Sequence, residues 1–164
     1  MKIIVMSDSH GDMETVQAVS ALPAEAHFHC GDSELAFDAS VLNRMYKVQG
    51  NCDFDSKFPK EVFVSVSGKT ILSVHGHEHN IKSSLMELYY IALEKDVDIV
   101  LFGHSHLYGA EMKNGILFVN PGSTMYPRGG KEPTYAVIEW CEHPKVTFKN
   151  MAHEVVDSIE IKII

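Results

Sequence analysis

The sequence predicts an α/β fold in which two β-sheets pack together and helices cover their outer sides. Short apolar runs rich in β-branched residues end in turn signals, as buried strands do. Residues 82–95 carry leucine, tyrosine and alanine at helical spacing, and the chain beyond residue 110 consists of short strand patterns separated by turns. With 164 residues, 45% of them hydrophobic, the chain 1–164 is expected to form one domain with a substantial core.

Strands and helices alternate in the first part of the chain. Asp12 is a suitable cap for a helix that Pro23 ends, because an aspartate accepts from the free N–H groups of the first turn and a proline cannot continue a helix. The expected elements here are a strand over 2–7, a helix over 13–22, a strand over 26–30, a short helix near 36–45 and a strand over 46–49.

A β-hairpin opens the second part of the chain. Val62, Val64 and Val66 alternate with polar residues, Gly68-Lys69 makes the turn, and 70–74 is the returning strand. Another strand, apolar throughout as if covered on both faces, is expected at 98–102. The remaining expected elements are a helix over 82–95 and strands over 116–119, 135–140, 145–149 and 159–163.

Composition and charge exclude several classes of protein. The formal net charge is −8 and the only arginines are Arg44 and Arg128, so a general nucleic-acid-binding surface is not expected. Three widely spaced cysteines make neither a disulfide framework nor a CxxC zinc site, and they favour a reducing, cytoplasmic location. No apolar stretch approaches the ~20 residues of a membrane span, and the first residues are too short for the apolar region of a signal peptide. The pattern is compatible with a monomer or an oligomer.

Polar residues gather where the apolar runs stop. The clusters are Asp8-Ser9-His10, Gly31-Asp32, Gly50-Asn51-Cys52-Asp53, His75-Gly76-His77 and Gly103-His104-Ser105-His106. Ligands of open α/β folds bind at the carboxyl ends of strands, so these clusters are expected to share one edge. Carboxylates, imidazoles and one amide bind divalent metals of mixed nitrogen and oxygen preference, which indicates a metal-dependent hydrolase.

Each cluster alone has an ordinary structural explanation. Asp8 and His10 are two residues apart on an extended segment and point the same way, but their residue types are also common in surface turns. A single Gly-Asp pair such as that ending in Asp32 is widespread, and His27 and His29, which alternate along a strand, are interpreted as structural. The hypothesis depends on the conjunction, because it is improbable by chance that every cluster falls at a strand end.

The order and spacing of these motifs resemble the calcineurin-like metallophosphoesterase superfamily, and within it the small YfcE-like phosphodiesterase branch. The resemblance covers essentially the whole chain, and it implies a four-layer α/β/β/α sandwich with two mixed β-sheets flanked by helices. It rests on Asp8-x-His10, Gly31-Asp32, Gly50-Asn51, His75 and Gly103-His104-x-His106, followed by Asn120-Pro121-Gly122-Ser123 and Arg128.

The resemblance also implies a site for two divalent metal ions that share a hydroxide, with a small phosphodiester as substrate. Manganese is the expected metal, and nickel, iron, cobalt and zinc suit the same ligands. Asp32, Asn51 and His75 are the residues expected to act in catalysis. The implied ligands are Asp8, His10 and His106 for the first metal, Asn51, His75 and His104 for the second, and Asp32 as the bridge.

One position departs from many larger relatives, in which a histidine follows the motif asparagine and assists the leaving group. Here that residue is Cys52, and a neutral thiol is a poor substitute. The departure keeps a second hypothesis open, a protein-binding scaffold of the same fold with weak or no catalysis, like a subunit of the retromer coat. A structural metal protein is a third hypothesis, although structural zinc favours closed tetrahedra of cysteine and histidine. His77 and His79 match no ligand position, and Arg128 is either a clamp for a second phosphate or a solvated side chain.

Overall fold

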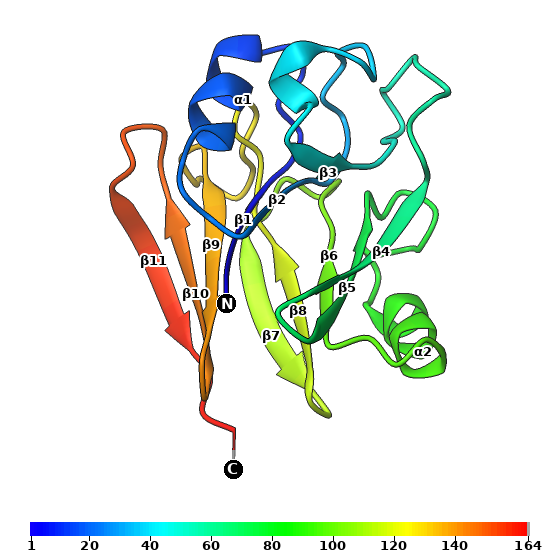
Figure 1. Cartoon of the computed structure of the whole chain (residues 1–164), viewed down its shortest axis with the longest axis vertical. Coiled ribbons are helices and arrows are strands. Elements are labelled where there is room, and N and C mark those ends of the chain that lie inside the picture. Colours follow the sequence, from blue (N-terminus) through cyan, green and yellow to red (C-terminus); the bar gives the residue numbers. More distant parts are fainter. Residues whose placement is uncertain (164) are drawn as a thin grey trace.

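Two mixed β-sheets form the centre of the protein, whose structure, a computed structural model, describes residues 1–163 (Figure 1). The strands of the first sheet are β1 (Lys2–Met6), β2 (Ala26–His29), β3 (Met45–Lys47), β9 (Tyr135–Trp140), β10 (Pro144–Lys149) and β11 (Val155–Glu160), in the order β11-β10-β9-β1-β2-β3. The strands of the second sheet are β4 (Glu61–Val66), β5 (Lys69–Val74), β6 (Ile99–Leu101), β7 (Gly109–Lys113) and β8 (Ile116–Asn120), in the order β4-β5-β6-β8-β7.

Helices cover the outer faces of the sheet pair. Helix α1 (Met13–Ser20) and the 3-10 helix η1 (Ser40–Leu42) lie on the first sheet, and α2 (Met86–Glu94) lies on the second, at the opposite side of the molecule in Figure 1. At the start of α1, Asp12 accepts from the Thr15 N–H (3.2 Å) and hydroxyl (2.7 Å), as the sequence predicted. The expected arrangement of layers is confirmed.

Three apolar clusters fill the three interfaces between the layers. On β1, Ile3 and Val5 face the second sheet, whereas Ile4 and Met6 face α1, because successive side chains of a strand point to opposite faces. The cluster between the sheets also contains Phe28, Ile71, Ile99, Leu117 and Val119. The outer cluster of the second sheet packs Leu88 and Ala92 of α2 against the sheet. Strands buried on both faces explain the continuous apolar runs in the sequence.

Parallel pairing brings the carboxyl ends of the central strands to one edge. In the first sheet β1 pairs in parallel with β2, and β2 with β3. In the second sheet β5 pairs in parallel with β6, and β6 with β8. The loops that leave these strands therefore lie at one edge of each sheet, which is where the polar clusters of the sequence occur.

Several expected elements differ from the structure. The helix near 36–45 is only the 3-10 turn η1, because side chains from a later loop and from β3 bind this backbone: the Phe37 N–H donates to Asp55 Oδ2 (2.8 Å) and Lys47 Nζ donates to Phe37 O (2.6 Å). The turn of the first hairpin is at Ser67-Gly68, one residue earlier than predicted.

Helix α2 begins at Met86, four residues later than predicted, and two edge strands also differ. The sequence analysis missed β7, whose Gly-Ala-Glu-Met-Lys sequence is a weak strand pattern, although Asn114-Gly115 after it is a strong hairpin signal. The last strand begins at Val155 and not at 159. Exposed polar residues occupy much of this edge strand and hide its pattern in the sequence. In the described part of the chain, no helix combines the length and the apolar character that crossing a bilayer requires.

Candidate metal centre

The loops that follow the strands of both sheets meet at one edge of the sandwich. The Asp8 N–H donates to Gly31 O (2.9 Å), which joins the loops after β1 and β2. The Gly103 N–H donates to His75 O (2.9 Å), which joins the loops after β5 and β6. Between the sheets, the His104 N–H donates to Asp8 Oδ2 (3.1 Å). The polar clusters therefore surround a common centre.

Two glycines allow this close approach of the loops. A Cβ at Gly103 would collide with the Ser7 hydroxyl and lie 2.7 Å from Asp8 Oδ2. A Cβ at Gly50 would collide with the Asp32 carboxylate. Since a side chain at either position would displace a buried carboxylate, only glycine fits.

Most of the candidate ligands have a left-handed backbone conformation. This conformation is uncommon for residues other than glycine, and it occurs at functional sites where the surrounding structure holds it in place. Here the φ angles lie between 44° and 71°, at His10, Asp8, Asp32, His106 and His104. Five of the seven predicted ligands thus share this conformation, which the structure also has at six other residues that are not glycine.

Asp8, His10 and His106 form a first group of potential metal ligands. The distances to Asp8 Oδ1 are 3.2 Å from His106 Nε2 and 3.9 Å from His10 Nε2. Asp8 Oδ1 and His10 Nε2 are both buried without a hydrogen-bond partner. Such atoms are costly to bury unless they bind a ligand, and a carboxylate with two imidazole nitrogens suits a divalent metal ion.

His75 Nε2 lies at the centre of a second group. It is 3.0 Å from Asn51 Oδ1, 3.2 Å from Asp32 Oδ2 and 3.7 Å from Asp8 Oδ1. All three neighbours are oxygen acceptors, so this nitrogen requires a cation beside it, either a proton or a metal ion. The imidazole of His104 lies next to that of His75, with ring centroids 5.1 Å apart, but among residues 1–163 its ring nitrogens have no carboxylate oxygen within 4.0 Å. Asp8 takes part in both groups.

Hydrogen bonds at Nδ1 orient three of the imidazoles. An acceptor at Nδ1 keeps the proton on that nitrogen and leaves the lone pair of Nε2 free for a metal, an arrangement common at metal sites. The pairs are His75 with Cys30 O (2.7 Å), His106 with Tyr126 O (2.6 Å) and His10 with Glu34 Oε1 (2.6 Å). The free nitrogens therefore point towards Asp8.

The carboxylates and imidazoles shift each other's pKa values. Burial would raise the pKa of Asp8, but contacts with His106, His75 and Ser7 outweigh it and leave the pKa lowered. Burial would also raise the pKa of Asp32, but the contact with His75 lowers it, and the net shift is downward. Burial would lower the pKa of His75, but the two carboxylates raise it, and contact with Asp8 raises that of His106.

His104 and His29 behave differently from these two imidazoles. Burial lowers the pKa of His104 to about 4, and the positive charges of His75 and Lys82 add to the effect. Burial also lowers the pKa of His29 to about 4, so this side chain is neutral. His29 Nδ1 accepts from the Gly31 N–H (3.1 Å) and its Nε2 lies 2.8 Å from the Ser9 hydroxyl, so it supports two loops of the centre.

Asp53 belongs to one of the predicted polar clusters, but sequence reasoning gave it no role. Its Oδ2 accepts from the N–H groups of Asp32 (2.8 Å) and Gly50 (2.7 Å), and its Oδ1 accepts from the Glu34 N–H (2.9 Å). One buried carboxylate thus fixes the loop of Asp32 against the loop of Asn51. An aspartate in a loop is too common for the sequence alone to assign this role.

The loop after β8 supports the centre from the other side. Ser123 Oγ donates to Asp8 O (2.7 Å) and accepts from the Tyr126 N–H (2.8 Å). Tyr126 in turn provides the carbonyl for His106, and its ring, 56% exposed, lies with its centroid 5.3 Å from that of His10. The family resemblance included Asn120 to Ser123 without a role, and the structure provides one.

Replacing Asp53 should loosen the centre. Asp53→Ala leaves three N–H groups without their acceptor, so the free energy of unfolding should fall by at least about 2 kcal/mol. Metal affinity should fall by about 10- to 100-fold, as for other residues that orient ligands. Denaturant unfolding and metal titration measure the two effects. The matched control is Asp38→Ala, because Asp38 is exposed and its one ion pair within residues 1–163, with Lys57, is 4.0 Å long. Equal behaviour of the two variants would contradict the assigned role.

Metal binding should strengthen as the pH rises. In the metal-free protein the pKa values of His75 and His106 are raised above the ordinary 6.5, so protons compete with metal ions up to a higher pH than at a free imidazole. Calorimetric titration with Mn²⁺ or Zn²⁺ in buffers of different ionisation enthalpy should detect proton release on metal binding even above pH 6.5, the ordinary imidazole pKa. His106→Gln should release fewer protons. A metal affinity that does not change with pH would contradict the predicted competition between protons and metal ions.

Comparisons with known proteins identify a family for the chain. Residues 1–143 match the calcineurin-like phosphoesterase superfamily domain. The chain is 39% identical over 141 residues to the probable metallophosphoesterase YsnB of Bacillus subtilis, covering 84% of this chain and 83% of YsnB. It is 25% identical over 172 residues to the phosphodiesterase YfcE of Escherichia coli, covering 85% and 88% of the two chains.

A solved structure extends the likeness to the fold. The crystal structure of a predicted phosphoesterase from Streptococcus pneumoniae superposes with a TM-score of 0.94 at 38% identity, over 98% of this chain and 96% of the other. The motifs at the strand ends, the two-sheet sandwich and the sequence match all lead to one conclusion: this chain belongs to the calcineurin-like phosphoesterase superfamily.

Proposed function

We propose that this protein hydrolyses small phosphodiesters at a centre of two divalent metal ions, with manganese as the first candidate. The observation that supports this best is the convergence of the Nε2 atoms of His10, His75 and His106 on the buried carboxylate of Asp8. The donor set of oxygen and imidazole nitrogen fits such ions. When bound, they would activate water and neutralise charge on the phosphate.

Asp32 is suited to bridge the two ions. Its Oδ1 is held by the Cys52 N–H (2.8 Å), while its Oδ2 faces His75 Nε2 (3.2 Å). One oxygen is thereby anchored to the protein and the other is directed into the centre. Asn51 presents Oδ1 to the same nitrogen at 3.0 Å, which places a neutral ligand where another carboxylate would reduce the positive charge of the site. A net positive site attracts phosphate despite the overall charge of −8.

Cys52 favours diesters with good leaving groups. Partial desolvation and the charge of Asp32 raise the pKa of the otherwise exposed Cys52 thiol to about 11, so it is neutral near pH 7 and does not supply an acidic proton. General acid catalysis contributes about 10²- to 10⁴-fold to such reactions, and substrates whose leaving groups need a proton lose that contribution. We therefore assign the protein to phosphodiesters and not to alkyl monoesters.

A scaffold of the same fold without catalysis is less well supported. Such a protein has no need for buried, unpartnered ligand atoms or for three imidazoles oriented through Nδ1. A structural zinc site is also disfavoured, because the converging donors in both groups around Asp8 include no cysteine. We place the reaction in the cytoplasm, where free cysteines such as Cys52 and Cys141 stay reduced.

Asp32 variants test the proposal. Asp32→Ala and Asp32→Asn should reduce metal-dependent turnover of bis(p-nitrophenyl) phosphate by at least about 100-fold, because either change removes the bridging charge. Asp32→Asn keeps the shape of the side chain and should leave the fold intact. Nitrophenol release and metal content per chain are the measurements, and Asp38→Asn is the control. Substantial metal-dependent activity in either Asp32 variant would show that the bridge is wrongly assigned.

Cys52 variants test the substrate class. Cys52→Ala should change diester turnover only modestly, since a neutral thiol contributes no proton. Cys52→His should raise kcat/KM for an alkyl monoester more than for bis(p-nitrophenyl) phosphate, because an imidazolium can protonate the leaving group.

Cys141→Ala is the control for the Cys52 series, as Cys141 is a second exposed cysteine. If Cys52→Ala abolishes diester hydrolysis as completely as Asp32→Ala does, Cys52 takes part in the reaction and the argument from its raised pKa fails.

A further inference from the structure

A pocket of about 480 Å³ lies beside the metal centre and plays no part in the site described so far. It is bounded by the segment before α2, by β7 and β8, and by the loop that carries His104 and His106. Ser105 lines it and separates the two histidines in the sequence, and the Arg128 N–H donates to His106 O (3.1 Å). The pocket is therefore continuous with the edge where the ligands converge, and its volume suits a small molecule.

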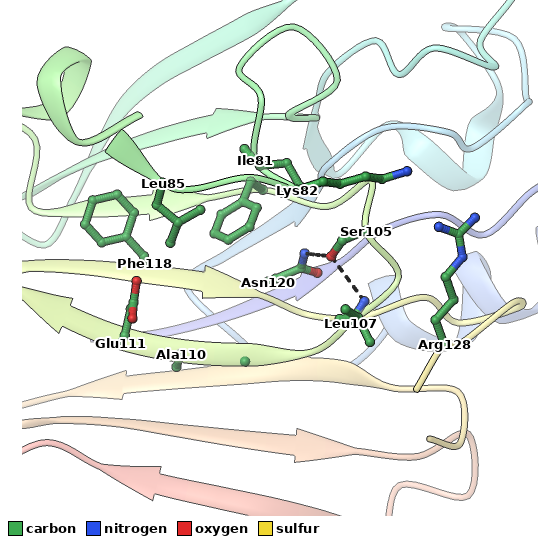
Figure 2. Close-up of a pocket in the computed structure, with 12 residues that line it drawn as sticks. Ile81, Lys82, Leu85, Ser105, Leu107, Ala110, Glu111, Phe118, Asn120 and Arg128 are labelled. Carbon is green, nitrogen blue, oxygen red and sulfur yellow. Dashed lines mark hydrogen bonds between the residues drawn. The ribbon is translucent and has the colours of Figure 1, made fainter. Parts of the chain in front are cut away.

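The pocket has a charged end and an apolar end. Figure 2 shows the side chains of Lys82 and Arg128 extending beyond Ser105, whereas Leu85 and Phe118 lie at the opposite end. Apolar surface predominates along the walls of the pocket. A ligand that consists only of phosphate or sugar would leave that surface uncovered, so the shape favours a ligand with an apolar body.

Lys82 and Arg128 have no acidic partner of their own. Among residues 1–163, neither has a carboxylate oxygen within 4.0 Å. Both cations line the same pocket, although the chain has a net charge of −8 and only two arginines. Glu111 lines the apolar end, where it disfavours an anion. The charges therefore favour a ligand whose anionic group lies at the end of Lys82 and Arg128.

We propose that this pocket binds the non-reacting part of the substrate, a group in which a second anion, phosphate or carboxylate, precedes an apolar or aromatic body. Along the substrate, the reacting phosphate lies at the metal centre, the second anion lies between Lys82 and Arg128, and the apolar body lies against Leu85 and Phe118. This assignment rests on the proposed phosphodiesterase function, and it makes Lys82 and Arg128 specificity-determining residues.

Binding to the metal-free protein tests the pocket separately from catalysis. The probes are 2-naphthyl phosphate and 2-naphthoate, which join an anion to an aromatic body, and inorganic phosphate and 2-naphthol, which each carry one part only. At least one joined probe should bind ~10-fold or more tightly than either part, and the better of the two identifies the second anion as phosphate or carboxylate. Lys82→Gln and Arg128→Gln should each weaken that binding by ~10-fold or more, the change expected when a hydrogen bond to a charged group is lost.

Matched controls exist for both substitutions. Lys95→Gln removes a lysine at the other end of α2, and Arg44→Gln removes the other arginine of the chain, outside the pocket, so both should bind the joined probe within about twofold of the wild type. Equal binding in the Lys82 or Arg128 variant and its control would overturn the proposal.

Two other outcomes would also overturn it. If inorganic phosphate binds as tightly as the joined probe, the site is a simple anion site. If 2-naphthol does so, the apolar wall acts without the cations, as it would for a docked protein segment. Turnover of bis(p-nitrophenyl) phosphate by the wild-type protein is measured in parallel. Absence of turnover defeats the proposed function, whereas turnover combined with insensitive probe binding defeats only the pocket assignment.

Discussion

The carboxylate of Asp8 lies where the two sheets meet, and the geometry of the centre depends on it. Burying a carboxylate is costly unless charges and hydrogen bonds compensate. Here the Ser7 hydroxyl (2.6 Å) and the His104 N–H (3.1 Å) donate to one oxygen, and imidazoles from both sheets face the other. The N–H of Asp8 links the two loops of the first sheet, and its carbonyl accepts a hydrogen bond from the Ser123 hydroxyl. The sandwich and the site are therefore stabilised by the same set of contacts.

The central strands and the outer helices could be predicted because their signals are local. A strand buried on both faces, such as 98–102, is a continuous apolar run, and a helix cap such as Asp12 acts within its own turn. The errors occurred where the structure is determined by residues distant in the sequence. The segment near 36–45 is held open by Asp55 and Lys47, and β7 forms only because β8 pairs with it.

The site was predictable in part for the same reason. Aspartates and histidines at strand ends are visible in the sequence, and parallel pairing brings strand ends together. The groups that orient them are not visible. The acceptors for His75 and His106 are main-chain carbonyls of Cys30 and Tyr126, which any residue could provide. Asp53 acts through contacts with three N–H groups that only the folded loops bring within reach.

Tyr126 connects the surface of the site to its interior. Its carbonyl accepts the Nδ1 proton of His106, its N–H is bound by Ser123, and its ring lies exposed beside His10. A molecule that stacks on the ring or pushes it aside moves the same residue that orients a candidate metal ligand. A molecule bound at the exposed ring of Tyr126 therefore also affects the hydrogen bond that orients His106. A residue outside the candidate ligand set can therefore influence the centre through its main chain.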